Sequence, residues 1–172
     1  MNESVFLLIN AGSVPNPLVL NIALFFSKIL PYLVMAASAL AFIFGGRQQR
    51  RYLLIIAIAA SGAALLSWLI GYFAYSPRPF IDSVGELWLA HRDTASFPSN
   101  HALFISIFAA TYLIFRQWLL GGLFLVLALG ISWSRVYLGV HYPLDIVGGV
   151  VLGVLVALCV AALLRPVLNL PG

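Results

Sequence analysis

Long apolar runs separated by short polar stretches make up most of the chain, and five of these runs approach or exceed the roughly 20 residues that a bilayer-spanning helix needs. In hydrocarbon every backbone N–H and C=O must be satisfied, and the runs lack the alternation of barrel strands. The pattern predicts an all-α, polytopic membrane helix bundle with about five transmembrane helices. The predicted spans cover residues 17–44, 52–75, 100–115, 118–134 and 143–165.

The N-terminus carries a shorter apolar segment, from Val5 to Ile9. This segment is too short to span a bilayer and favours a short amphipathic helix that lies in the interface. The region also lacks the basic start, the long apolar middle and the cleavage site of a signal peptide, so we expect it to remain in the mature protein. No second domain is visible, and we predict a single membrane-embedded domain over residues 1–172.

Composition supports a membrane protein, because 63% of the residues are hydrophobic and only 8% are charged, against about 25% charged in soluble domains. The net charge of +4 comes from nine Lys and Arg residues that are scattered along the chain. A basic face for nucleic acid is therefore not expected. Cys159 is the only cysteine, which excludes a disulfide framework and a cysteine-rich metal site.

The loops between the predicted spans differ in charge. Alternating the spans across the bilayer places five arginines on one face, which the positive-inside rule assigns to the cytoplasm. The loops 76–99 and 134–142 then face outward and hold most of the polar chemistry. The five arginines are Arg47, Arg50, Arg51, Arg116 and Arg165.

Two polar clusters flank the longer outward loop. In the first, two prolines stiffen the backbone around Arg78, although a turn whose arginine meets lipid headgroups would look the same. In the second, Ser99 or Asn100 can cap a helix whose free N–H groups bind an anion such as phosphate. His101 on the first turn would lie beside that anion, and a capped helix with an interfacial histidine is the alternative.

A third cluster spans residues 134–145 and gives the strongest signal. Pro143 suits the first turn of a helix, which puts Asp145 near the helix start and within reach of His141 four residues earlier. A carboxylate bonded to one imidazole nitrogen fixes the tautomer and frees the other nitrogen to attack. A purely structural ion pair or cap is the alternative.

Together the clusters supply two arginines, a helix N-terminus and two histidines. Phosphoryl transfer requires such a set, because the transferring group must be held by fixed donors and the leaving oxygen needs a proton. A zinc site formed by His101, His141 and Asp145 is the competing interpretation, but Arg78 and Arg135 would repel the cation. We therefore predict a phosphate site without a metal.

These residues, in this order and spacing, resemble the three motifs of the type 2 phosphatidic acid phosphatase (PAP2) superfamily of membrane lipid phosphatases. Residues 78–79 match the Arg-Pro of the first motif, and residues 98–101 match the Pro-Ser-x-His of the second. Residues 134–145 contain the complete Ser-Arg-x5-His-x3-Asp of the third. Within the superfamily, the chain is most similar to bacterial undecaprenyl-diphosphatases of the bacitracin-resistance type.

The resemblance implies a role for each matched residue. His141 would attack phosphorus and form a phosphohistidine, Asp145 would orient it, and His101 would protonate the leaving group and then activate water. No metal or cofactor is implied. The phosphate would be held by Arg78, Ser99 and Arg135.

The implied reaction is hydrolysis of undecaprenyl diphosphate to the monophosphate, which recycles the lipid carrier for cell-wall synthesis. The implied location is the bacterial cell (inner) membrane, with the site facing the periplasm or exterior and membrane lipids as neighbours. Sibling activities remain open: a phosphatase or phosphotransferase acting on phosphatidylglycerol phosphate, phosphatidic acid or lipid A. A non-catalytic lipid-binding protein is a rival from another class, although headgroup binding needs no oriented imidazole.

The chain departs from the superfamily pattern at two positions. Gly71 stands where a lysine is usual, seven residues before the first-motif arginine, and Asn100 replaces a glycine and could add a side-chain donor. Lys28, the only lysine, lies within the first span, where a charge is costly. We hypothesise that it partly replaces the missing lysine at the second phosphate. A lysine that snorkels, or that bonds carbonyls freed by Pro31, is the alternative.

Overall fold

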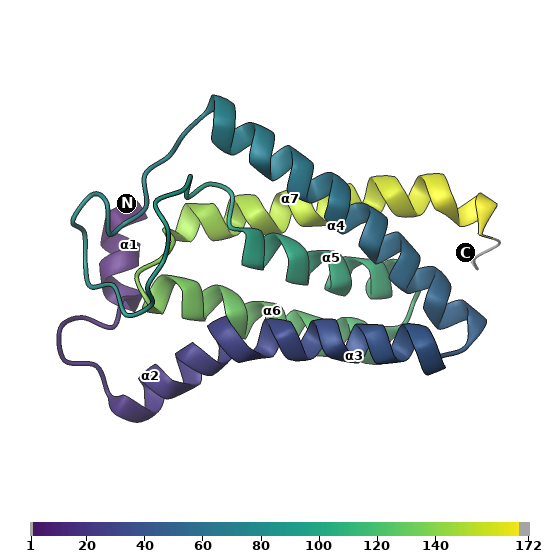
Figure 1. Ribbon diagram of the computed structural model, residues 1–172, viewed down its shortest axis with the longest axis horizontal. Helices are drawn as coiled ribbons and strands as arrows, with labels where there is room; N and C mark the ends of the chain where they lie inside the picture. Colours follow the sequence, from purple (N-terminus) through teal and green to yellow (C-terminus); the bar gives the residue numbers. More distant parts are fainter. Residues whose placement is uncertain (1, 169–172) are drawn as a thin grey trace.

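The computed structural model describes residues 2–168, and within that range it contains helices and no strand (Figure 1). The all-α prediction is confirmed. A short π-helix, η1, joins two α-helices into one continuous stretch at the first span. The elements are α1 (Asn2–Ile9), α2 (Pro17–Leu24), η1 (Phe25–Ile29), α3 (Leu30–Phe44), α4 (Arg47–Phe73), α5 (Asn100–Ile114), α6 (Trp118–Tyr137) and α7 (Pro143–Val167).

Four of the described helical stretches are long and apolar enough to cross a membrane: Pro17–Phe44, Arg47–Phe73, Trp118–Tyr137 and Pro143–Val167. The remaining predicted span, residues 100–115, corresponds to α5, a shorter apolar helix of 15 residues. The predicted bounds agree to within a few residues. The largest difference is at the start of α4, because helical hydrogen bonding continues into a polar, arginine-rich first turn that hydropathy does not mark.

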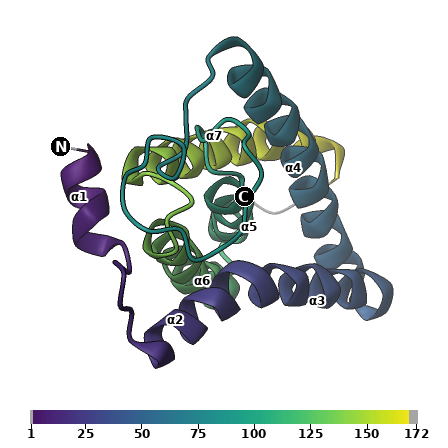
Figure 2. The same cartoon turned by 60° about the vertical axis from the view of Figure 1, so that its left-hand side comes forward.

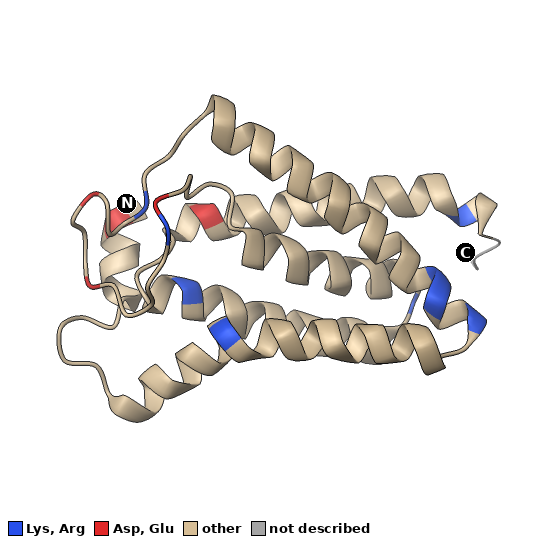
Figure 3. Cartoon of the chain, in the orientation of Figure 1, with Lys and Arg blue, Asp and Glu red and all other residues tan. Residues whose placement is uncertain are grey.

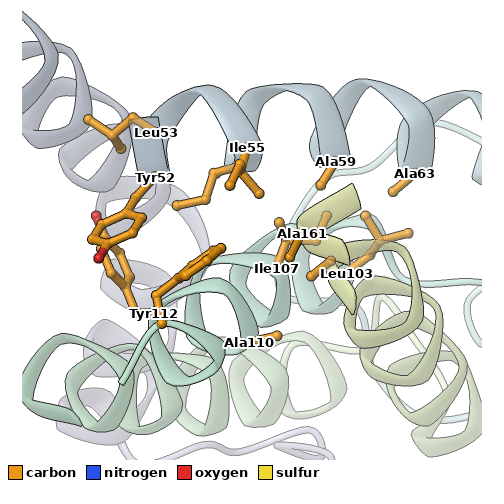
Figure 4. Packing of buried hydrophobic residues seen from close by; sticks show 13 residues of the cluster. Tyr52, Leu53, Ile55, Ala59, Ala63, Leu103, Ile107, Ala110, Tyr112 and Ala161 are labelled. Atoms are coloured by element: carbon orange, nitrogen blue, oxygen red, sulfur yellow. The ribbon is translucent and has the colours of Figure 1, made fainter. Parts of the chain in front are cut away.

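The short helix α5 lies inside the bundle, packed against α4, α6 and α7 (Figures 1 and 2). Its Leu103 and Ile107 are fully buried among small side chains of the neighbouring helices (Figure 4). Small residues let helix backbones approach closely, which is the usual source of packing energy in a membrane. On these neighbouring helices, the small buried residues of the core are Ala59 and Ala63 on α4 and Ala157 and Ala161 on α7.

Two glycines on α7 bring that helix against the start of α5. A Cβ at Gly149 would lie 2.5 Å from the carbonyl oxygen of Ser99, and one at Gly153 would lie 2.5 Å from that of Leu103. The close approach allows the Ser99 N–H to donate to the Asp145 carbonyl at 2.9 Å. The second and third sequence clusters are thereby fixed to each other.

The N-terminal helix α1 runs across one end of the bundle (Figure 1). Phe6 is fully buried with its ring edge against Tyr142, at 5.4 Å between centroids, while Leu8 on the same helix is 85% exposed. One face packs on protein and the other is apolar and open, as expected for an interfacial helix. The Asn10 side chain then ties this end together through hydrogen bonds to the backbone of Glu86 and Tyr137.

Charge is divided between the two ends of the bundle (Figure 3). All five acidic residues belong to α1, the α4–α5 connection or the first turn of α7, which meet at one end, here called the loop end. Five of the nine basic residues lie at the opposite end, at the start of α4, between α5 and α6, and near the end of α7. This is the asymmetry from which the sequence predicts orientation.

Candidate active site

The turn between α6 and α7 places His141 beside Asp145. Tyr142 occupies the N-cap position of α7, and its N–H donates to Asp145 Oδ2 at 2.8 Å. The same oxygen lies 3.5 Å from His141 Nδ1. Both side chains are almost completely buried, at 2% and 3% exposure. The spacing of four residues therefore produces the predicted imidazole–carboxylate pair.

Ser96 is a third member of this group, which sequence reasoning missed. Its hydroxyl donates to Asp145 Oδ2 and lies 3.3 Å from His141 Nδ1, and the residue is fully buried. Ser96 comes from the α4–α5 connection, whose course depends on long-range contacts, so spacing alone carries no signal for it. The bridge restricts both the carboxylate and the imidazole.

The contacts of His141 define its tautomer. Arg78 Nη1 lies 3.3 Å from His141 Nε2, and a guanidinium has only donors to offer. Nε2 must therefore carry the lone pair, and the proton lies on Nδ1, toward Asp145. The pKa of His141 is lowered to about 4, chiefly by burial and also by the charges of Arg78 and Arg135, although the hydrogen bond to Asp145 opposes the shift. The lowered pKa favours the neutral imidazole, with the lone pair on Nε2.

Arg78 is buried and makes contacts with all three nitrogens of its guanidinium. Nε donates to the Thr94 carbonyl at 2.9 Å, Nη2 to the Ala95 carbonyl at 3.0 Å and Nη1 to the Val140 carbonyl at 3.1 Å. Arg78 therefore holds the α4–α5 connection against the α6–α7 turn. A phosphoryl oxygen bound by Arg78 would take the place of the His141 contact, and this role stays a prediction.

The departure at Gly71 lies beside the same loop. A Cβ at Gly71 would lie 2.9 Å from the Ala95 Cβ, next to the backbone that Arg78 holds. Any side chain at this position would press on Ala95. The glycine that stands in place of the usual lysine therefore allows the α4–α5 connection to pack closely onto α4.

The start of α5 presents unpaired donors to the site. Ser99 occupies the N-cap position, but neither its hydroxyl nor that of another residue caps the helix, so the predicted side-chain cap is wrong. The Ser99 Oγ is fully buried and finds no partner within residues 2–168. The first helical bond runs from the Leu103 N–H to the Ser99 carbonyl, which leaves the amides of residues 100–102 without intrahelical acceptors. Such an end binds anions.

His101 and Asn100 lie on the first turn of α5, at one end of an apolar groove of about 590 Å³. The groove runs between α3, α4 and α5, with Val34, Ala60 and Phe104 among its walls. Asn100 is exposed, and its Oδ1 accepts a hydrogen bond from the Ser67 hydroxyl at 2.7 Å. The amide oxygen is thus engaged with α4.

Arg135 reaches the first span. It is 2% exposed, its Nη1 donates to the hydroxyl of Ser27 at 2.7 Å, and its Nε has no partner in the described part of the chain. Lys28, the next residue after Ser27, is exposed, so η1 turns the serine and not the lysine toward Arg135. The proposed help of Lys28 at a second phosphate stays a prediction.

The third histidine also lies near the site. The ring centroid of His91 is 6.4 Å from that of His141, and His91 Nδ1 lies 2.9 Å from the Arg92 carbonyl. Burial lowers the pKa of His91. Three histidines and two arginines from separate segments thus converge at the loop end.

Residues 49–167 of this chain match the PAP2 superfamily. The chain belongs to the PAP2 superfamily. It is 38% identical over 155 residues to the putative undecaprenyl-diphosphatase YbjG of Escherichia coli K12, covering 90% of this chain and 78% of YbjG. It is 29% identical over 178 residues to the undecaprenyl-diphosphatase BcrC of Bacillus subtilis 168, covering 99% of this chain and 89% of BcrC.

The fold of this PAP2 protein also occurs in a solved structure. The crystal structure of Aquifex aeolicus LpxE superposes with a TM-score of 0.77 and 23% identity, covering 94% of each chain. The predicted resemblance to PAP2 proteins is confirmed by the family match, and the helical architecture by this similarity. The protein is a multi-pass PAP2 membrane protein.

Proposed function

We propose that this PAP2 protein is a membrane lipid phosphatase that hydrolyses undecaprenyl diphosphate to the monophosphate through a phosphohistidine at His141. One observation carries the proposal. The buried His141 presents an unprotonated Nε2, while Nδ1 is held by Asp145 and Ser96. An imidazole held in this way is prepared for nucleophilic attack and not only for headgroup binding.

In the first step, Nε2 of His141 attacks the terminal phosphorus. The P–N bond forms as the bridging P–O bond breaks, and His101 donates a proton to the departing lipid monophosphate. The proton on His141 Nδ1 remains there, hydrogen-bonded toward Asp145, which stabilises the charge that the ring acquires. In-line attack places the leaving group on the side opposite His141.

In the second step, His101 removes a proton from water, which attacks the phosphohistidine. The P–N bond breaks and inorganic phosphate leaves with His141 restored. Charge on the phosphoryl oxygens is stabilised by Arg135 and by the free amides at the start of α5, both fixed before the reaction begins. Since these groups supply the positive field, the proposed reaction requires no metal ion.

The apolar groove supports a lipid substrate. It begins at His101, the residue proposed to protonate the leaving group, and the leaving group carries the lipid. Its remaining walls come mainly from apolar side chains of α3, α4 and α5. A polyprenyl chain in the groove would therefore be continuous with the departing phosphate.

The names of the relatives support a polyprenyl diphosphate in particular, because YbjG and BcrC are both named as undecaprenyl-diphosphatases. We propose that the site faces the exterior or periplasm, since the arginines of the opposite end would face the cytoplasm. There the enzyme would recycle the lipid carrier of cell-wall synthesis.

A substrate panel on the purified protein in detergent with EDTA tests the proposed function. We expect undecaprenyl diphosphate to be hydrolysed with kcat/KM about tenfold or more above that for phosphatidylglycerol phosphate, phosphatidic acid and lipid A. EDTA should change the rate less than about twofold. A preference for one of the other lipids, or a rate that EDTA removes and zinc restores, would contradict the proposal.

A further inference from the structure

The first membrane span contributes to the predicted phosphate site through Ser27. This residue is 3% exposed although only 11% of the apolar window in this span is buried. It belongs to η1, where the Leu30 N–H bonds the Phe25 carbonyl five residues earlier. π-turns of this kind are rare and occur frequently at functional sites.

The π-turn is fitted against α6. A Cβ at Gly130 would lie 2.2 Å from Cε1 of Phe26, so the phenyl ring occupies the space that the glycine leaves. Ser27 follows directly and accepts its hydrogen bond from Arg135, further along α6, at 2.7 Å. Packing and hydrogen bonding therefore hold η1 in register with Arg135.

The bond to Ser27 defines which edge of the Arg135 guanidinium remains available. A guanidinium has five N–H donors in a rigid plane, and it can bind phosphate oxygens through two parallel hydrogen bonds. Ser27 takes Nη1. The opposite edge, formed by Nε and Nη2, is the one that suits bidentate binding, and its buried Nε has no partner within residues 2–168. A buried donor without an acceptor is costly, and an incoming oxygen would remove that cost.

We propose that Ser27 is a positioning residue that turns the Nε–Nη2 edge of Arg135 toward the phosphoryl group. Ser27 lies outside residues 49–167, which match the PAP2 superfamily, so the first span adds an element of its own to the site. The inference rests on the proposed function only in naming phosphate as the bound group.

The test measures equilibrium binding of inorganic phosphate to the full-length protein in detergent, by the rise in unfolding temperature with phosphate concentration. Ser27→Ala should weaken binding about tenfold, because a charge-assisted contact of Arg135 loses its orientation. Ser27→Thr, which keeps the hydroxyl, should stay within about threefold of wild type. In an Arg135→Met background, Ser27→Ala should have no further effect beyond about twofold, since coupled residues are not additive.

Ser61→Ala is the matched control, because among the described residues the Ser61 hydroxyl bonds only the Ala57 carbonyl of its own helix, and Ser61 is exposed on α4. Wild-type phosphate affinity in Ser27→Ala, or the same loss with and without Arg135, would overturn the proposal. If Ser27→Ala does not fold, Ser27→Cys keeps the volume with a weak acceptor and should show the loss. Failure of both to fold would make Ser27 structural and also overturn the proposal.

Because phosphate binding needs no turnover, this result is separate from that of the substrate panel. A protein that hydrolyses no lipid diphosphate, yet loses phosphate affinity in Ser27→Ala, would contradict the proposed function alone. A protein that hydrolyses the diphosphate, but binds phosphate equally well in both forms, would contradict only the role of Ser27.

Discussion

His141→Ala is expected to reduce turnover of undecaprenyl diphosphate below about one per cent of wild type, because the atom that attacks phosphorus is removed. The ring lies in the turn between α6 and α7, outside the helical core clusters, so the folded protein should persist. The measurement is steady-state release of phosphate, together with the unfolding temperature in detergent.

His91→Ala is the matched control, since it removes a neighbouring histidine ring that lies 6.4 Å from His141. We expect this variant to keep its turnover to within about tenfold of wild type. Residual activity of His141→Ala above one per cent would contradict its role as nucleophile. Equal losses in the two variants would point instead to general damage at the loop end.

Asp145→Asn should produce the second largest loss, about a hundredfold to ten-thousandfold in kcat, because a neutral amide cannot stabilise the positive charge that the His141 ring acquires. In the present structure Asp145 Oδ2 receives the Ser96 hydroxyl and the Tyr142 N–H and lies beside His141 Nδ1. These two donors keep the amide oxygen of an asparagine at that position. The negative charge that would stabilise the phosphorylated, positively charged ring is then missing.

Asp82→Asn serves as control for Asp145→Asn. Asp82 is another carboxylate at the same end, and it accepts a hydrogen bond from the Tyr142 hydroxyl at 3.0 Å. Its replacement should leave kcat within about threefold of wild type, since only one partly buried hydrogen bond away from His141 is weakened. A loss in Asp145→Asn no larger than in Asp82→Asn would contradict the orienting role.

The sequence predicts the helices well because long apolar runs that lack the alternation of barrel strands are stable in hydrocarbon only as helices. The pair formed by His141 and Asp145 was equally accessible, since a proline at the first turn and a spacing of four residues define it locally. The predictable part of the site is thus the part encoded within a single turn and helix start.

Contacts between distant segments could not be read in this way. Ser96 reaches Asp145 only because the α4–α5 connection is held over the bundle, and Ser27 reaches Arg135 only because η1 widens the first span. The charge of Lys28 makes it the candidate phosphate ligand of the first span in the sequence. In the structure Lys28 is exposed and the neighbouring Ser27 is buried. The predicted side-chain cap is also wrong, since the Ser99 hydroxyl has no hydrogen-bond partner within residues 2–168.

The most direct test of the account is to trap the covalent intermediate. Undecaprenyl diphosphate labelled with ³²P in the terminal phosphate is mixed with the enzyme, quenched with base, and the labelled peptide is mapped. The account predicts an acid-labile phosphoryl group on His141 that is absent from His141→Ala. Release of labelled phosphate with no labelled protein under any of these conditions, or label on another residue, would contradict it.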